Sequence, residues 1–140
     1  MLSFFDTNIL VYLFDQDAPA KQQRARQLFA DEVEAGRFVA STQVLQEFYV
    51  TVTRKLAEPL TAESAEEAVA TLADLNITPV DPPLIIAAIQ RCRRMKISFW
   101  DALIIESAIA AGARLLLSED LQHGRSIDGL TIENPFASLP

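Results

Sequence analysis

The stretch Leu2-Ser3-Phe4-Phe5-Asp6-Thr7-Asn8-Ile9-Leu10-Val11-Tyr12 decides the fold of this chain. Its first four residues form a short apolar run that fits a buried strand. Asp6 to Asn8 are polar residues that favour the start of a helix, and apolar residues then follow at helical spacing. The stretch predicts a strand, a sharp turn and a helix, with the Asp6 carboxylate where open α/β sheets bind ligands. From this stretch alone, Asp6 can equally be only a helix cap.

The rest of the chain repeats this alternation of short strands and longer helices. Further strands are expected at about 37–40, 77–80, 114–117 and 130–133, and helices at about 19–35, 42–55, 62–75, 82–96 and 98–112. Such alternation predicts an α/β fold of three α/β/α layers around a mostly parallel sheet of four to five short strands. No repeat or linker divides the sequence, so residues 1–140 are expected to form a single domain.

The composition indicates a globular protein without membrane-spanning segments, internal disulfides or a zinc site. A chain of 140 residues, half of them hydrophobic, is large enough for one globular core. It contains no apolar run of membrane-spanning length and no signal-peptide pattern, so no membrane contact is expected. Cys92 is the only cysteine, which fits a reducing cytoplasm as the location. His123 is the only histidine, which argues against a zinc site.

The net charge of −7 argues against a simple nucleic-acid binder, because such proteins usually present a basic face. Metal ions can, however, locally invert the sign of the field and let an acidic enzyme act on a phosphate polymer. The total charge therefore leaves nucleic acid open as a substrate, and the positions of the acids matter more than their sum.

Four carboxylates occur at positions that can converge at one end of the sheet. Asp120 follows the strand 114–117 as Asp6 follows the first strand, while Asp101 and Glu47 lie near the starts of two helices. Each has an ordinary alternative: Asp101 can form a capping box with Ser98, and Glu47 can simply be solvated. Four carboxylates without histidine or cysteine nearby form an oxygen ligand set that suits Mg²⁺ or Mn²⁺.

Four short motifs in this order and spacing resemble those of PIN-domain ribonucleases. They are Asp6-Thr7-Asn8-Ile9-Leu10, Gln46-Glu47-Phe48, Phe99-Trp100-Asp101-Ala102-Leu103-Ile104 and Ser118-Glu119-Asp120. The resemblance covers nearly the whole chain and is closest to the compact bacterial VapC-type toxins of toxin–antitoxin pairs. The first and third motifs are the more specific ones. Glu119 can substitute for Asp120, but the family pattern favours the acid two residues after the serine.

The resemblance implies a metal-dependent endoribonuclease that is the toxin of such a pair. Four acids would bind one or two Mg²⁺ or Mn²⁺ ions, and a metal-activated water would attack the scissile phosphorus. The residues so assigned are Asp6, Glu47, Asp101 and Asp120. Thr7, Asn8 and Ser118 match positions that orient the carboxylates or the water. The resemblance further implies a homodimer and a cognate antitoxin protein whose tail lies over the active-site groove.

Two groups of basic residues are candidates for contacts with the RNA backbone. Arg91, Arg93, Arg94 and Lys96 lie just before the third motif, and Lys21 and Arg24 lie at the start of the second helix. Contacts of this kind are electrostatic and independent of sequence. The alternative for the first group is a favourable interaction with the C-terminus of its own helix.

Two other classes of protein remain as alternatives. A phosphatase of the haloacid-dehalogenase type also places an Asp after its first strand, but it needs a second acid two residues on, where this chain has Asn8. It also needs a lysine near the later carboxylates, and none follows Lys96. A catalytically silent RNA-binding or interaction module on the same fold is the other alternative. The presence of all four acids argues against it.

Overall fold

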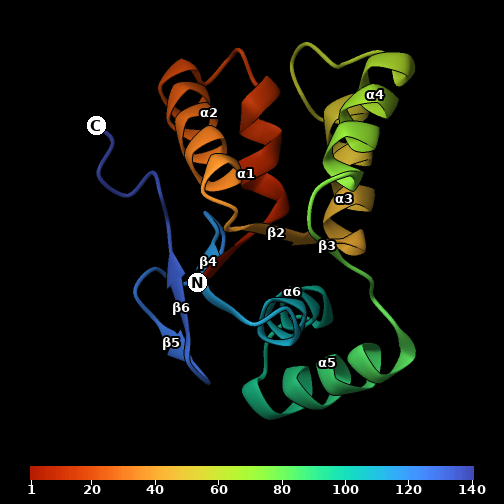
Figure 1. Cartoon of the computed structure of the whole chain (residues 1–140), viewed down its shortest axis with the longest axis vertical. Coiled ribbons are helices and arrows are strands. Elements are labelled where there is room, and N and C mark those ends of the chain that lie inside the picture. The colour runs from red at the N-terminus through yellow and green to blue at the C-terminus, as the bar shows by residue number, and fades with distance from the viewer.

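A single six-stranded sheet forms the centre of the molecule in a computed structural model that describes all 140 residues (Figure 1). The strand order is β3-β2-β1-β4-β6-β5, and only β5 runs antiparallel to its neighbour. The strands are β1 (Leu2–Phe5), β2 (Phe38–Ser41), β3 (Ile77–Thr78), β4 (Ala113–Leu117), β5 (Ser126–Ile127) and β6 (Leu130–Glu133).

Helices cover the sheet on both sides, which confirms the predicted α/β/α layering. In Figure 1, α1 to α4 lie on one side of the central strands, and α6 lies on the other side with α5 outside it. The helices are α1 (Thr7–Val11), α2 (Pro19–Glu34), α3 (Thr42–Arg54), α4 (Ala62–Ala73), α5 (Pro82–Met95) and α6 (Phe99–Ala110), and a 3₁₀ turn, Tyr12–Phe14, follows α1. None of these helices combines the length and the apolar character needed to cross a lipid bilayer.

Short polar side chains start the helices where the sequence predicts them to start. The side chain of the residue before each of four helices accepts a hydrogen bond from a backbone N–H in the first turn, which satisfies one of the free donors there. These caps are Ser41 for α3, Thr61 for α4, Asp81 for α5 and Ser98 for α6. The boundaries of the helices that carry Glu47 and Asp101 are therefore fixed by local sequence.

The strand β5 is a correction to the prediction of four to five strands. Its two residues pair with β6 through a turn at Asp128 and Gly129, which both have positive φ angles, of 49° and 86°. An Asp-Gly pair is typical of a tight hairpin with such angles. The pair is visible in the sequence, but the flanking strands are too short to produce a hydrophobic alternation.

The sheet changes its winding direction at β1, and this change positions the candidate site. The chain runs from β1 outwards to β2 and β3, and it returns through α5 and α6 to β4 on the other side of β1. The last residues of the two central strands pair with each other, Phe5 with Leu117. The Asp6 N–H then donates a hydrogen bond to the Leu117 carbonyl at 3.0 Å. Residues that follow β1 and β4 are therefore neighbours, although more than a hundred positions separate them in the chain.

Candidate active site

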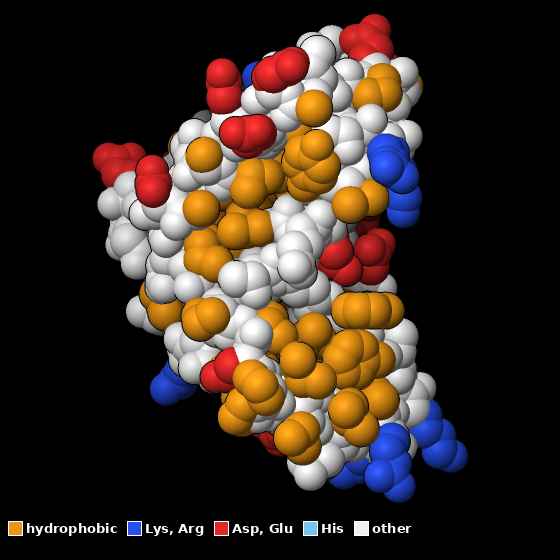
Figure 2. All heavy atoms as spheres, turned by 90° about the vertical axis from the view of Figure 1, so that its right-hand side faces the viewer, with side chains coloured by type: hydrophobic (Ala, Val, Ile, Leu, Met, Phe, Trp, Pro, Cys, Tyr) orange, Lys and Arg blue, Asp and Glu red, His pale blue; other side chains and the backbone are white.

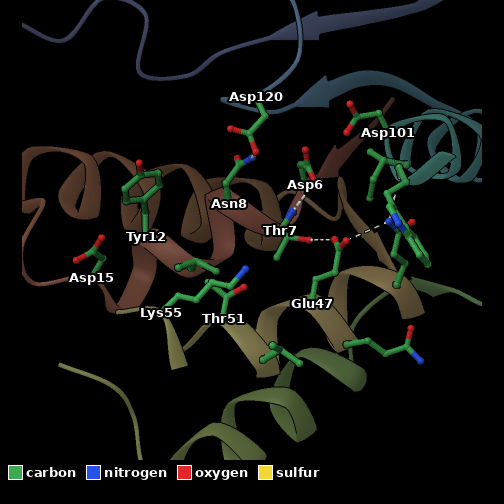
Figure 3. Close-up of a pocket in the computed structure, with 16 residues that line it drawn as sticks. Asp6, Thr7, Asn8, Tyr12, Asp15, Glu47, Thr51, Lys55, Asp101 and Asp120 are labelled. Carbon is green, nitrogen blue, oxygen red and sulfur yellow. Dashed lines mark hydrogen bonds between the residues drawn. The ribbon is translucent and has the colours of Figure 1, made fainter. Parts of the chain in front are cut away.

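A pocket of about 690 Å³ lies at the carboxyl ends of β1 and β4 (Figure 3). Its walls come from α1, α3, α6 and the segment after β4. All four carboxylates singled out from the sequence line it: Asp6, Glu47, Asp101 and Asp120. In open parallel sheets, ligands bind at such a point, where the strand order reverses.

Asp6 is the most buried of the four carboxylates. Its Oδ2 accepts a hydrogen bond from the Ser118 hydroxyl at 2.7 Å, and its Oδ1 accepts one from the Thr7 N–H at 2.7 Å. Burial raises the pKa of Asp6 to about 6, and the charges of Glu47 and Asp120 act in the same direction, while the two hydrogen bonds oppose them. A nearby cation would relieve both the desolvation and the repulsion.

Glu47 connects three helices around the pocket. Its Oε1 accepts a hydrogen bond from the Thr7 hydroxyl at 2.7 Å, and its Oε2 accepts one from Gln43 Nε2 at 3.3 Å. The same Gln43 nitrogen donates to the Trp100 carbonyl at 3.3 Å (Figure 3). Gln43 is buried, and its Oε1 has no hydrogen-bond partner. The carboxylate is thus bonded to α1 and, through Gln43 of its own helix, linked to α6, rather than solvated at a helix edge.

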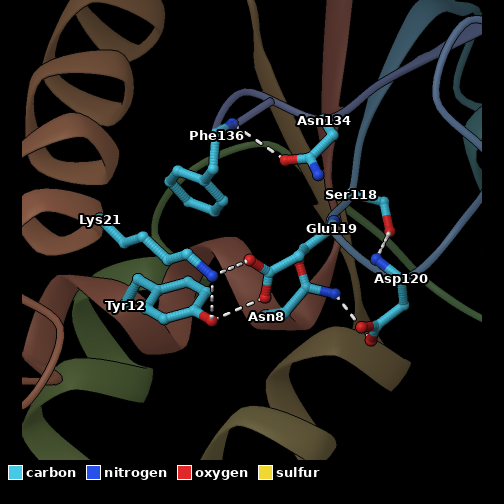
Figure 4. A network of polar contacts seen from close by, with 8 residues as sticks. All are labelled: Asn8, Tyr12, Lys21, Ser118, Glu119, Asp120, Asn134 and Phe136. Carbon is cyan, nitrogen blue, oxygen red and sulfur yellow. Dashed lines mark hydrogen bonds and ion pairs between the residues drawn. The ribbon is translucent and has the colours of Figure 1, made fainter. Parts of the chain in front are cut away.

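Asp120 is held by Asn8. The Asn8 Nδ2 donates to Asp120 Oδ2 at 2.9 Å, while its Oδ1 accepts a hydrogen bond from the Glu119 N–H at 3.1 Å (Figure 4). The Ser118 hydroxyl oxygen also accepts from the Asp120 N–H at 3.2 Å. The side chains of Thr7, Asn8 and Ser118 therefore each donate to a different carboxylate, namely Glu47, Asp120 and Asp6.

Glu119 points away from the pocket into a separate ion pair. Its carboxylate accepts a hydrogen bond from the Tyr12 hydroxyl at 2.6 Å and pairs with the Lys21 ammonium group (Figure 4). The Lys21 nitrogen also lies 5.1 Å from the centre of the Tyr12 ring and 5.7 Å from that of Phe136. Of the two adjacent acids that the sequence leaves open, only Asp120 lines the pocket.

Asp101 is the only one of the four carboxylates that accepts no hydrogen bond from the protein. The N-terminus of α6 is capped by Ser98, whose hydroxyl oxygen accepts from the Asp101 N–H at 3.0 Å. The Asp101 side chain does not reach back to the Ser98 amide, so the capping-box interpretation is wrong. Figure 3 shows its carboxylate turned towards the space that it shares with Asp6 and Asp120.

The donors that line the pocket fit a hard divalent cation. Five carboxylates line it, the four named above and Asp15, against a single cation, Lys55. As the side chains stand, no three of them lie close enough together to hold an ion. The donor set is nonetheless all oxygen and carries a large excess of negative charge, which is the environment that Mg²⁺ and Mn²⁺ favour.

The predicted basic residues do not line the pocket. Arg91 is buried, donates to Asp128 at 2.8 Å and pairs with Glu106, so it joins α5 to α6 and to the β5–β6 turn. That structural role rules it out as an RNA contact. Lys21 pairs with Glu119, and Arg24 donates to the Pro135 carbonyl at 3.3 Å. Arg93, Arg94 and Lys96 are exposed at the C-terminal end of α5.

Several pocket residues were missed by the sequence analysis. Gln43, Thr51 and Lys55 lie one turn before, one turn after and two turns after Glu47, so they share its face of α3. This four-residue spacing could have identified them once Glu47 was chosen. Trp100, which stands out in the sequence only as part of the third motif, is 60% exposed at the edge of the pocket.

The chain belongs to the PIN domain family, whose sequence model matches residues 3–126. This assignment agrees with the fold and with the four motifs. No curated protein of known function has a sequence that matches the chain significantly.

Several solved structures have the same fold, among them a VapC toxin, a VapBC complex and a further toxin–antitoxin complex. VapC20 of Mycobacterium tuberculosis, described as a toxin that cleaves the sarcin–ricin loop, has 20% identity and a TM-score of 0.68, with 84% of this chain and 89% of that one covered. A DNA-bound VapBC complex from Salmonella typhimurium has 21% identity and a TM-score of 0.67, with coverage of 96% and 99%. A toxin–antitoxin complex from Klebsiella pneumoniae has 20% identity and a TM-score of 0.68, with coverage of 95% and 97%.

Proposed function

We propose that this protein is a metal-dependent endoribonuclease and the toxin of a toxin–antitoxin pair. The observation that carries the proposal is that Asp6, Glu47, Asp101 and Asp120, from four separate segments, line one pocket at the point where the strand order reverses. Membership of the PIN domain family and the structural likeness to toxins such as VapC20 support the same function.

The proposed cofactor is Mg²⁺ or Mn²⁺, one or two ions, held by the four carboxylates. Such an ion supplies an acidified water as nucleophile and neutralises charge on the phosphate. The chain's own contribution is to fix the ligands. Ser118 holds Asp6, Thr7 holds Glu47 and Asn8 holds Asp120, each through one hydrogen bond. Outer contacts of this kind orient ligands and raise their affinity for a metal.

The proposed partners are RNA as substrate, a second copy of the chain and an antitoxin protein, all in the cytoplasm. Toxin–antitoxin complexes among the structures of similar fold support the antitoxin. Figure 2 shows hydrophobic side chains gathered on the face that carries α3, α4 and α5. The exposed apolar residues of these helices include Ile85, Ile86 and Ile89 on α5 and Tyr49 on α3. Such a patch is typical of a surface for protein contacts.

The contacts of Asn8 weaken the phosphatase alternative. A haloacid-dehalogenase-type mechanism places an acid at that position, whereas Asn8 here donates to one carboxylate and accepts from the backbone of Glu119. The silent-module alternative predicts RNA binding without cleavage. Both alternatives can therefore be separated from the proposal by a direct assay.

The test is an incubation of the purified chain with mixed RNA and, separately, with a phosphomonoester, each with Mg²⁺ or with a chelator. The proposal predicts internal cleavage of RNA with Mg²⁺ and none with the chelator, because the ligands alone supply no acidified water. Phosphate release from the monoester without RNA cleavage would favour the phosphatase. Binding of RNA without cleavage would favour the silent module.

Replacement of Asp120 should abolish most RNA cleavage, whereas replacement of the adjacent Glu119 should leave most of it intact. Asp120→Asn removes a charged ligand and is expected to reduce Mg²⁺-dependent cleavage by more than about 100-fold, since losing even the partner of a ligand typically costs about 10- to 100-fold. Glu119→Gln, whose side chain faces Tyr12 and Lys21, is expected to keep cleavage within about tenfold of wild type. The cleavage rates of both variants, measured on the same RNA, distinguish the two acids. A larger loss in Glu119→Gln than in Asp120→Asn would make Glu119 the metal ligand.

A further inference from the structure

We propose that Trp100 stacks on an unpaired base of the bound RNA and that Lys55 contacts a backbone phosphate on the other side of the carboxylates. This inference rests on the proposed function, because it concerns how the same pocket holds an RNA strand. It adds two contacts that position the substrate, neither of which touches the reacting atoms.

Trp100 is presented as a rigid aromatic surface. It lies in the first turn of α6, which Ser98 caps, and its side chain is 60% exposed at the edge of the pocket. Phe99 packs against it edge-to-face, with ring centres 5.1 Å apart and planes at 76°. A large exposed indole on a well-held helix end is suited to stacking on a base, since little conformational freedom remains to be lost.

Hydrogen bonds fix the position of Trp100 relative to the carboxylates. Gln43 Nε2 donates to the Trp100 carbonyl and to Glu47 Oε2, both at 3.3 Å, and Asp101 follows Trp100 directly in α6. The indole is therefore attached to the backbone segment that carries one carboxylate and is linked to the side chain of another. A base stacked on Trp100 would be held next to the carboxylates that bind the scissile phosphate.

Lys55 lies at the opposite end of the same row on α3. It follows Glu47 by two helical turns, a rise of about 12 Å, and it is the only cationic side chain that lines the pocket. Unlike Lys21, it forms no salt bridge. An ammonium group that lines a pocket with five carboxylates, yet pairs with none of them, is available to a phosphate of the strand.

The arrangement selects for a single strand. Stacking on a side chain requires a base that is free of its partner, and recognition by stacking depends little on which base it is. A strand that spans Trp100 and Lys55 would pass over the face of α3 that carries Glu47. The pocket should therefore bind an unpaired RNA segment and should bind the same sequence weakly within a duplex.

The first test uses Trp100 as its own reporter, because it is the only tryptophan in the chain. A short unstructured RNA is titrated onto the wild-type protein, once with a chelator and once with Mg²⁺ in the first seconds after mixing. Binding is followed by the anisotropy of a label on the RNA, and stacking by quenching of the tryptophan fluorescence. The inference predicts quenching that follows the binding curve, and weaker binding and quenching with the RNA in a perfect duplex.

Variants with matched controls provide the second test. Trp100→Ala should weaken binding of the unstructured RNA by about 5- to 160-fold, the usual range for one stacked base, and Trp100→Phe should recover part of the loss. Gln23→Ala, at an exposed position of α2 outside the pocket, is the control. Lys55→Gln should weaken binding and flatten its salt dependence by about one counterion. Arg54→Gln makes the same change of charge one residue away and outside the pocket, so it should weaken RNA binding and flatten its salt dependence less than Lys55→Gln does.

The outcomes separate this inference from the proposed function. Cleavage of RNA by the wild type, with binding but no quenching, would overturn the role of Trp100 and leave the function intact. A tryptophan fluorescence change that depends on the concentration of protein rather than on the concentration of RNA would assign Trp100 to a protein interface and overturn the inference. If RNA is neither bound nor cleaved in either condition, both the function and the inference fail.

Discussion

Asp6→Asn is expected to lose Mg²⁺-dependent RNA cleavage by more than about 100-fold while the protein stays folded. The change removes one negative charge from the ligand set without changing the size of the side chain, and even loss of a ligand's hydrogen-bond partner costs about 10- to 100-fold in many metal sites. Asp101→Asn should behave in the same way, since its carboxylate faces the pocket without any partner in the protein. Cleavage rates of labelled RNA, with circular dichroism as the check on folding, measure both effects.

The control for these variants is Asp74→Asn. Asp74 ends α4, is exposed and does not line the pocket, so the same chemical change there should leave the cleavage rate unchanged. A folded Asp101→Asn protein that cleaves at nearly the wild-type rate would remove Asp101 from the mechanism. Similar losses in all three variants would point to a general effect of charge instead of a site.

Asp6 is also expected to make the metal-free protein less stable as the pH rises. Burial raises the pKa of Asp6 from 3.8 to about 6, so the folded protein holds this proton more tightly than the unfolded chain does. The stabilisation by protonation is complete below the unfolded pKa and is lost as the pH rises through the folded pKa. The loss amounts to about 3 kcal/mol of unfolding free energy by neutral pH.

The effect of Asp6 is isolated by comparing the wild type with Asp6→Asn, because Asn does not titrate. With a chelator present, the unfolding free energy of Asp6→Asn minus that of the wild type should increase by about 3 kcal/mol between about pH 3 and pH 7. Denaturant titrations at several pH values measure it. Glu32 and Asp128, whose pKa values are lowered by Arg37 and Arg91, contribute in the opposite direction but cancel in this difference. A difference that does not vary with pH would contradict the raised pKa.

The sequence predicted the fold well because its signals are local. Apolar runs, capping residues such as Ser41 and Ser98, and the alternation of elements predict the strands and helices without knowledge of tertiary contacts. The placing of Asp6 and Asp120 after parallel strands likewise predicts that they are neighbours. The short hairpin strand β5 was missed because two residues carry no periodicity.

The surroundings of the carboxylates could not be predicted because they depend on long-range contacts. Lys21 and Glu119 are far apart in the sequence, and only the folded structure shows that they pair and leave Asp120 on the pocket. Arg91 belongs to a run of basic residues that resembles a phosphate-binding cluster, yet it is buried against Glu106. Helical spacing gives the face of a residue on its own helix, but not the element that will cover it.

The most direct test of the metal site is the rate of RNA cleavage as a function of Mn²⁺ concentration, for the wild type and for Glu47→Gln. Glu47, which Thr7 and Gln43 hold at the pocket, is one of the proposed ligands, so its neutral replacement should weaken metal binding. We expect no cleavage with a chelator, a saturating rise in rate with Mn²⁺, and a midpoint for Glu47→Gln at least about tenfold higher than for the wild type. Cleavage that persists in the chelator, or identical midpoints for the two proteins, would contradict it.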